Sequence, residues 1–197
     1  MSQDTEISGA YGHMFTIDLL GPATAINPPG AEGDMGKDTS TGWLTAAHNA
    51  TQVCFQSYQL PHGFVENHSG GTLGAFEPHV HWQKTTSASG TVAFRLRYRW
   101  ANIGSVWTDW SAPITVTTPA VSDRDTAGVH ALTTFGPIIL PNAKISAGIL
   151  CEVARVGSGG SYGASIFITD IDAHVTVNSP GSVQLYTKYR GGELSFS

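Results

Sequence analysis

The segment TVAFRLRYRW, residues 91–100, alternates large apolar side chains with arginines. One set of alternate positions holds Val92, Phe94, Leu96, Tyr98 and Trp100, and the other holds Arg95, Arg97 and Arg99. Successive side chains of a β-strand point to opposite faces, so a period of two predicts a strand with one face in an apolar core. The chain must therefore supply a sheet in which this strand has a buried face and a polar face.

Two further segments show the same alternation. GAFEPHVHWQKT, residues 74–85, places Phe76, Pro78, Val80 and Trp82 on one face. SIFITDIDAHVTV, residues 165–177, is predicted to place Phe167, Ile171, Ala173, Val175 and Val177 inward and Ile168, Asp170, Asp172, His174 and Thr176 outward. Eight to ten strands of this kind are expected, with turn signals between them and no convincing helix. The sequence predicts an all-β protein, a single antiparallel β-sandwich of jelly-roll type.

The expected domain organisation has three parts. Residues 1–42 form an N-terminal arm with a long irregular segment, since residues 21–42 are rich in Pro, Gly, Asp and Thr without periodicity. Residues 43–190 form the sandwich, and residues 191–197 form a C-terminal tail. Because residues 21–42 show no core-forming pattern, we expect them to become ordered only against a partner subunit.

Charge and hydropathy argue against several classes of partner. The formal net charge is −5 and no run of Lys or Arg occurs, so we expect no nucleic-acid partner. No apolar run reaches the roughly 18 residues of a membrane span. The polar opening MSQDTEISGAYG does not resemble a signal peptide, which predicts synthesis in a cytoplasm. Cys54 and Cys151 lie in apolar settings and are predicted to be buried free thiols.

Three predicted strands have strongly polar outer faces, which carry the candidate site residues. If the arginine strand and the aspartate strand are neighbours, their charges can pair, each pair contributing about 0.2–1 kcal/mol. The alternative is that a second copy covers these faces, because arginine is enriched at protein interfaces. The residues predicted to lie at a subunit interface are Arg95, Arg97, Arg99, Asp170 and Asp172.

His79 and His81 raise the question of a metal site. They share one strand face about 6.6–6.8 Å apart, and one ion needs about four ligands. His174 could be a third ligand, and Asp170 or Asp172 could serve if their strand is adjacent. Three copies meeting at a threefold axis could also surround one ion with six imidazoles. No carboxylate follows the pair as it would in a cupin, so we expect no metal and no cofactor, with both histidines donating to nearby carboxylates or carbonyls.

Signatures of enzymatic chemistry are missing from the sequence. It contains no G-x-S-x-G, no phosphate-binding glycine loop before a helix and no H-E-x-x-H, so the chain is not expected to be an enzyme. Tryptophans that could stack on a sugar remain as an alternative, although such residues more often fill a core. These are Trp43, Trp82, Trp107 and Trp110.

Several motifs resemble a family of uncharacterised phage and prophage virion structural proteins. The matching residues are Leu60 to Gly63 (LPHG), Pro78 to Trp82 (PHVHW), the strand 91–100, Cys151, Asp170 to Val175, and Gly181 to Lys188. The resemblance covers about residues 60–190 and implies a virion-associated protein encoded among head and tail genes.

The function expected from this resemblance is assembly into a phage particle. The favoured role is a head accessory protein, a decoration or cement protein that binds the major capsid protein as a homotrimer. A neck or tail component, such as a fibre base or a spike-like piece, is the alternative. A metal-dependent cupin-like enzyme or a sugar-binding protein is a more distant one.

Overall fold

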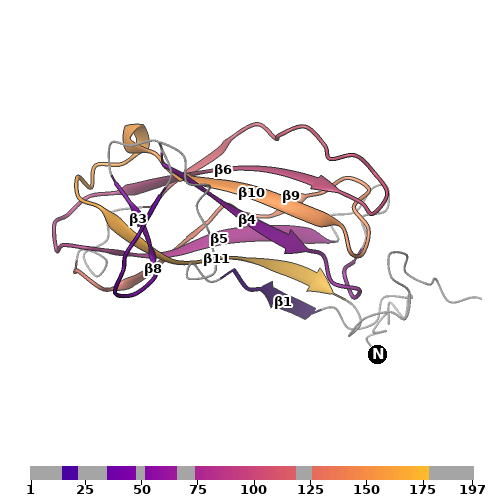
Figure 1. Cartoon of the computed structure of the whole chain (residues 1–197), viewed down its shortest axis with the longest axis horizontal. Coiled ribbons are helices and arrows are strands. Elements are labelled where there is room, and N and C mark those ends of the chain that lie inside the picture. Colours follow the sequence, from indigo (N-terminus) through magenta and orange to yellow (C-terminus); the bar gives the residue numbers. More distant parts are fainter. Residues whose placement is uncertain (1–14, 22–34, 48–51, 66–73, 119–125, 178–197) are drawn as a thin grey trace, which may run out of the picture.

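The computed structural model describes residues 15–21, 35–47, 52–65, 74–118 and 126–177, which form two antiparallel β-sheets packed face to face (Figure 1). Sheet A has the order β2-β3-β11-β5-β8, and β1 and β9 pair with β11 and β5 respectively. Its strands are β1 (Phe15–Leu19), β2 (Gly36–Lys37), β3 (Leu44–Ala46), β5 (Ala75–Lys84), β8 (His130–Thr134), β9 (Ile138–Ile139) and β11 (Ile166–Val177). Sheet B has the order β4-β10-β6-β7, from β4 (Val53–Gln59), β10 (Gly148–Arg155), β6 (Val92–Ala101) and β7 (Ile114–Thr118).

The strand order identifies the topology as a jelly roll. Between β3 and β6 the chain changes sheet at every step, and β6 and β7 are then joined as neighbours in sheet B. From β7 it returns to sheet A for β8 and β9, crosses to β10 and ends on β11. The resulting paths, β3-β11-β5-β8 facing β4-β10-β6-β7, are those of an eight-stranded jelly roll. The predicted fold class is confirmed.

The core lies between the sheets and is built from the alternation seen in the sequence. Phe94 and Leu96 on β6 are fully buried, and Tyr98 and Trp100 pack partly buried against the same cluster. Trp82 of sheet A meets Phe94 of sheet B with ring centroids 6.0 Å apart. The predicted inward face of residues 91–100 is therefore confirmed.

Cys54 and Cys151 are buried free thiols, as predicted. They lie on the adjacent strands β4 and β10 and belong to the hydrophobic core. Burial among apolar side chains raises the pKa of both thiols, because the interior disfavours a thiolate.

Strand β11 departs from the predicted pattern at its beginning. A β-bulge lies between Ile168 and Asp170 in the pairing with β5, so one extra residue shifts the alternation. Ile168 is consequently fully buried, whereas Phe167 is only partly buried and packs beside Trp43, with ring centroids 6.0 Å apart. The prediction that Phe167 points inward and Ile168 outward was wrong for this reason. The remainder of the strand follows the predicted alternation.

Parts of the expected N-terminal arm belong to sheet A. Strand β1 pairs with β11 along its whole length, and β2 pairs with β3. Met35 is buried in the core, so residues 35–42 pack against their own chain rather than only against a partner. Residues 1–14 and 22–34 lie outside the described residues, as does the expected tail at 191–197.

The described part of the chain contains one short helical turn, the 3₁₀ turn η3 (Gly157–Gly159). No helix among these residues has the length and apolar character that a membrane span requires.

Candidate functional site

The outer face of sheet A brings histidines and aspartates together on its two central strands. β5 and β11 are adjacent and antiparallel, with His79 directly opposite Asp172 and His81 opposite Asp170. Because Val80, Trp82, Ile171 and Ala173 occupy the core, the residues between them face away from it. The condition that the aspartate strand lies next to the histidine strand is therefore met.

Three of these side chains converge, and we call them the His–Asp cluster: His79, His81 and Asp172. The Nε2 atom of His79 lies 2.8 Å from Oδ1 of Asp172, and Nε2 of His81 lies 3.2 Å from the same oxygen. The residues His79 and Asp172 are only 3% and 7% exposed, although they lie on the outer face. Oδ1 of Asp172 is therefore buried against both ring nitrogens.

Further polar groups surround the His–Asp cluster. His130 on β8 lies with its Nε2 2.7 Å from Nδ1 of His81, and the two rings stack. Nδ1 of His79 lies 3.3 Å from the carbonyl oxygen of Glu77. His174 packs its ring against that of His79, with centroids 4.4 Å apart. The His174 Nε2 atom turns to Asp18 on β1, at 2.8 Å from its Oδ1.

The electrostatic environment differs between the two histidines. Burial favours the neutral ring of His79, but the carboxylate of Asp172 more than offsets it and raises the pKa of His79. Burial dominates at His81 and lowers its pKa. Burial alone would raise the pKa of Asp172, yet the neighbouring His79 lowers it, so this carboxyl is ionised at neutral pH. The cluster thus holds a buried anion facing two imidazoles.

The candidate metal ligands that the structure brings together differ from the expected set. His174, expected as the third ligand, contacts Asp18 instead, and Asp172 takes the third place beside His79 and His81. Asp170 lies opposite His81 in the register but does not belong to the converging set. The expected contact of both histidines with a carboxylate is present, at Asp172.

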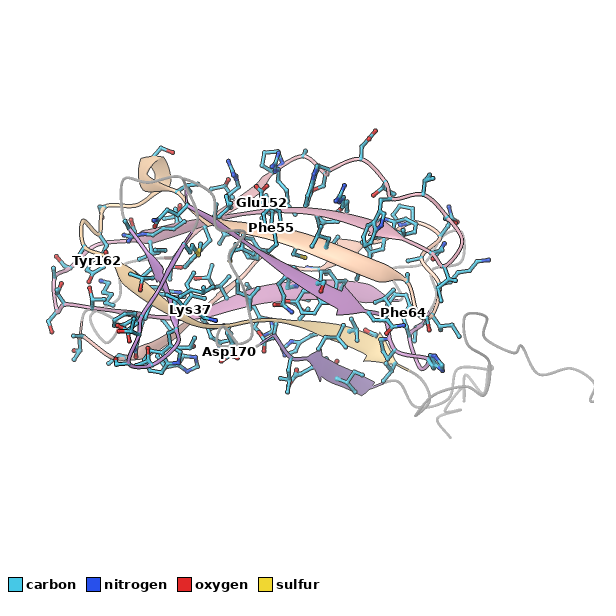
Figure 2. All side chains as sticks on the ribbon, viewed as in Figure 1. Lys37, Phe55, Phe64, Glu152, Tyr162 and Asp170 are labelled. Carbon is cyan, nitrogen blue, oxygen red and sulfur yellow. The ribbon has the colours of Figure 1, made fainter. Side chains whose placement is uncertain are left out.

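The arginine row lies on the opposite side of the molecule. Arg95, Arg97 and Arg99 are on β6 in sheet B, whereas Asp170 and Asp172 are on β11 in sheet A. Figure 2 shows this separation, with Glu152 on the upper sheet and Asp170 below the lower one. The two rows therefore do not pair within one chain. Contact between them across two copies stays a prediction.

A buried glutamate on β10 is the real partner of the arginines. Glu152 is 5% exposed and lies opposite Arg97 in the β10–β6 register. Arg97 donates from Nε to Oε1 at 3.0 Å and from Nη2 to Oε2, while Nη2 of Arg95 donates to Oε1 at 3.1 Å. A guanidinium that grips both carboxylate oxygens is held in a fixed orientation.

Two tryptophans from the β6–β7 connection complete this surface. The Arg99 guanidinium carbon lies 4.9 Å from the ring centroid of Trp110 and 5.5 Å from that of Trp107. Trp110 also reaches Arg97, at 5.4 Å, and Phe55 of β4, at 6.2 Å between centroids. We call this surface the Arg–Trp face; it comprises Phe55, Arg95, Arg97, Arg99, Trp107, Trp110 and Glu152.

The tryptophans considered for sugar stacking do not share one surface. Trp82 fills the core, and Trp43 lies beside Phe167 on sheet A. Trp107 and Trp110 lie on sheet B over arginines, and Trp107 is 47% exposed. The expectation that such residues fill the core therefore holds for Trp82 but not for Trp107.

Sequence reasoning missed three groups that shape these surfaces. Glu152 interrupts the apolar run of the segment GILCEVAR, and a charge within a buried strand is a signal for a partner on a neighbouring strand. His130 and Asp18 come from short strands whose pairing only the structure gives. No local pattern marks either of them.

Comparisons with known proteins find similarity only at the level of structure. No protein-family model and no curated protein matches the chain. The infectious bursal disease virus Gx strain structure is 13% identical with a TM-score of 0.42, covering 92% of this chain and 38% of that one. The CBM36-1 domain of a multidomain xylanase from the hindgut metagenome of Trinervitermes trinervoides is 9% identical with a TM-score of 0.40, covering 81% of this chain and 96% of the domain.

An Arthrobacter globiformis T6 isomalto-dextranase complexed with panose is also similar, at 16% identity and a TM-score of 0.41, covering 80% of this chain and 23% of the enzyme. The chain thus spans well under two thirds of the viral protein and of this enzyme. Likenesses this weak carry no argument about function. The assignment of a jelly roll stands on the strand order described above.

Proposed function

We propose that this chain is a non-enzymatic structural protein of a bacteriophage particle that binds other particle proteins through the Arg–Trp face. The favoured placement is a head accessory protein, acting as a homotrimer that decorates or cements the capsid. A neck or tail component is the alternative placement. The resemblance of the motifs around residues 60–190 to those of phage structural proteins motivates the setting, and the Arg–Trp face supports binding as the activity.

The composition of the Arg–Trp face is the observation that carries this proposal. Arginine and tryptophan are enriched in the cores of protein interfaces and dominate their binding energy. Here the rings hold Arg99 in place and Glu152 holds Arg97, so little side-chain freedom is lost on binding. Three guanidinium groups and one carboxylate leave two positive charges on a chain of net charge −5, which favours an acidic partner surface.

Exposed apolar side chains extend the same surface. Seven large hydrophobic residues are exposed in the described part of the chain, and three of them belong to the β6–β7 connection. These are Ile103, Val106 and Trp107, with Val106 90% exposed. Backbone hydrogen bonds hold the connection against β6, from Thr108 N to the carbonyl oxygen of Trp100 and from Ser111 N to that of Tyr98. A fixed loop that presents apolar side chains beside arginines suits a protein contact.

Reversing the charge of Arg99 tests the proposal with little effect on the fold. Arg97 is a poorer choice, because its loss would leave the buried Glu152 with Arg95 alone. Particles that lack the wild-type protein would be supplied with the Arg99→Glu protein. The occupancy, meaning the number of copies bound per purified particle, would then be measured. We expect the affinity for the particle to fall by at least about tenfold, the effect of about 1.4 kcal/mol of binding energy, with a matching loss of occupancy when the protein is below saturation.

Lys37→Glu is the matched control, because it makes the same charge change at an exposed position on sheet A. It should leave occupancy unchanged. Full occupancy of the Arg99→Glu protein, with an unchanged thermal melt, would contradict a binding role for the Arg–Trp face.

A further inference from the structure

We propose that the His–Asp cluster is a binding site for one divalent transition-metal ion, zinc above all, within a single chain. Two imidazole nitrogens and one carboxylate oxygen form a ligand set that such ions prefer. The three residues come from the two central strands of sheet A, so the ion would join β5 to β11 at the middle of the sheet. This inference is independent of the proposed function.

The distances between the three ligand atoms fit a shared ion. Zinc binds imidazole nitrogen at about 2.0–2.1 Å and carboxylate oxygen at about 2.0–2.2 Å, so two ligands at a tetrahedral angle lie about 3.3 Å apart. The observed separations from Asp172 Oδ1 are 2.8 Å to His79 Nε2 and 3.2 Å to His81 Nε2. All three atoms lie within 4.8 Å of one another, so small side-chain rotations complete the site.

One carboxylate oxygen faces both imidazole nitrogens. Asp172 Oδ1 is buried and lies close to Nε2 of His79 and Nε2 of His81 at the same time. Ligands of one ion converge on a common point in this way.

The other ring nitrogens are placed as metal-bound histidines require. A ligating histidine usually donates from its second nitrogen to an acceptor, which leaves the first free to coordinate. Nδ1 of His79 faces the carbonyl oxygen of Glu77, which can only accept, so this nitrogen carries the hydrogen. Nδ1 of His81 has His130 Nε2 as its partner at 2.7 Å. When Nδ1 donates there, Nε2 of His81 is free to bind the ion.

Burial argues against a site shared by three chains. An ion on a threefold axis needs imidazoles that project from the surface toward the axis. His79 is 3% exposed and its Nε2 turns toward Asp172 of the same chain. His81 is the more accessible ligand, with 22% of its side chain exposed, so an ion can reach the cluster from solvent at this residue.

Metal titration of the full-length protein tests this site. The protein would be stripped with a chelator and titrated separately with Zn²⁺ and Co²⁺, with stoichiometry from calorimetry and coordination from the visible absorption of Co²⁺. We expect one ion per chain and a rise in melting temperature on loading. Asp172→Asn, which keeps the side-chain shape, and His81→Ala should each weaken binding by at least about tenfold and remove the melting shift.

Arg99→Ala is the control, because this side chain lies on the Arg–Trp face of the other sheet. It should bind metal like the wild type. If Asp172→Asn does not fold, metal binding by His81→Ala tests the site instead, because the His81 side chain is partly exposed. Absence of stoichiometric binding, wild-type affinity in His81→Ala, or one ion per three chains would overturn the proposal.

Discussion

At the scale of single residues, alternate positions on β6 have opposite environments. Phe94 and Leu96 are fully buried between the sheets, while Arg95 and Arg97 at the alternate positions reach the outer face and share Glu152. Burying Glu152 is tolerated because two guanidinium groups satisfy its oxygens, whereas Oδ1 of Asp172 on the other sheet lies against the imidazoles of His79 and His81. Each buried carboxylate therefore marks the centre of one candidate surface.

Truncation of Phe94 should be costly, because its ring contacts the core from the middle of sheet B. We expect Phe94→Ala to lower the free energy of unfolding by about 3–5 kcal/mol through lost burial and the cavity left behind. Urea denaturation measures this change. Val106→Ala, at a 90% exposed position, should change the stability by less than about 0.5 kcal/mol. A loss below about 1 kcal/mol in Phe94→Ala would show that the faces of β6 are reversed.

At the scale of strands and connections, the alternating patterns predicted the strands but not their partners. Period two placed Phe94 inward, His79 and His81 on one face, and Asp172 on the outer face of its strand. It could not show that β5 lies beside β11 or that β6 belongs to the other sheet, because pairing between distant strands depends on the whole topology. The bulge after Ile168 was also hidden, since a single extra residue leaves the sequence pattern almost unchanged.

One glycine fixes the connection between β5 and β6. Gly90 has a φ of +137°, and an added Cβ would lie 2.7 Å from Tyr162 N. Gly90→Ala should therefore cost roughly 2–6 kcal/mol, combining backbone strain with a backbone clash. Gly104 also has a positive φ, +78°, but a Cβ there would have no neighbour within 4 Å.

Gly104→Ala serves as the matched control and should cost about 1–2 kcal/mol from the backbone conformation alone. Thermal or urea unfolding of the two variants separates the clash from the strain. Equal losses of stability would mean that the β5–β6 connection does not pack tightly against Tyr162.

At the scale of the whole molecule, the jelly roll keeps two kinds of chemistry on opposite faces. Sheet A carries the buried His–Asp cluster, and sheet B carries the Arg–Trp face with exposed apolar side chains beside it (Figure 2). The ion site that we propose lies on the first face, and the partner-binding surface that we propose lies on the second. Because the two surfaces lie on different sheets, a change at one of them need not alter the other.

The proposed function is tested by a reconstruction, at a resolution that shows side chains, of the phage particle to which we propose that this protein belongs. We expect density for this jelly roll in the particle, with the Arg–Trp face covered by an acidic surface of a neighbouring protein or of another copy. Absence of the chain from purified particles, or an Arg–Trp face turned to solvent in every copy, would contradict it.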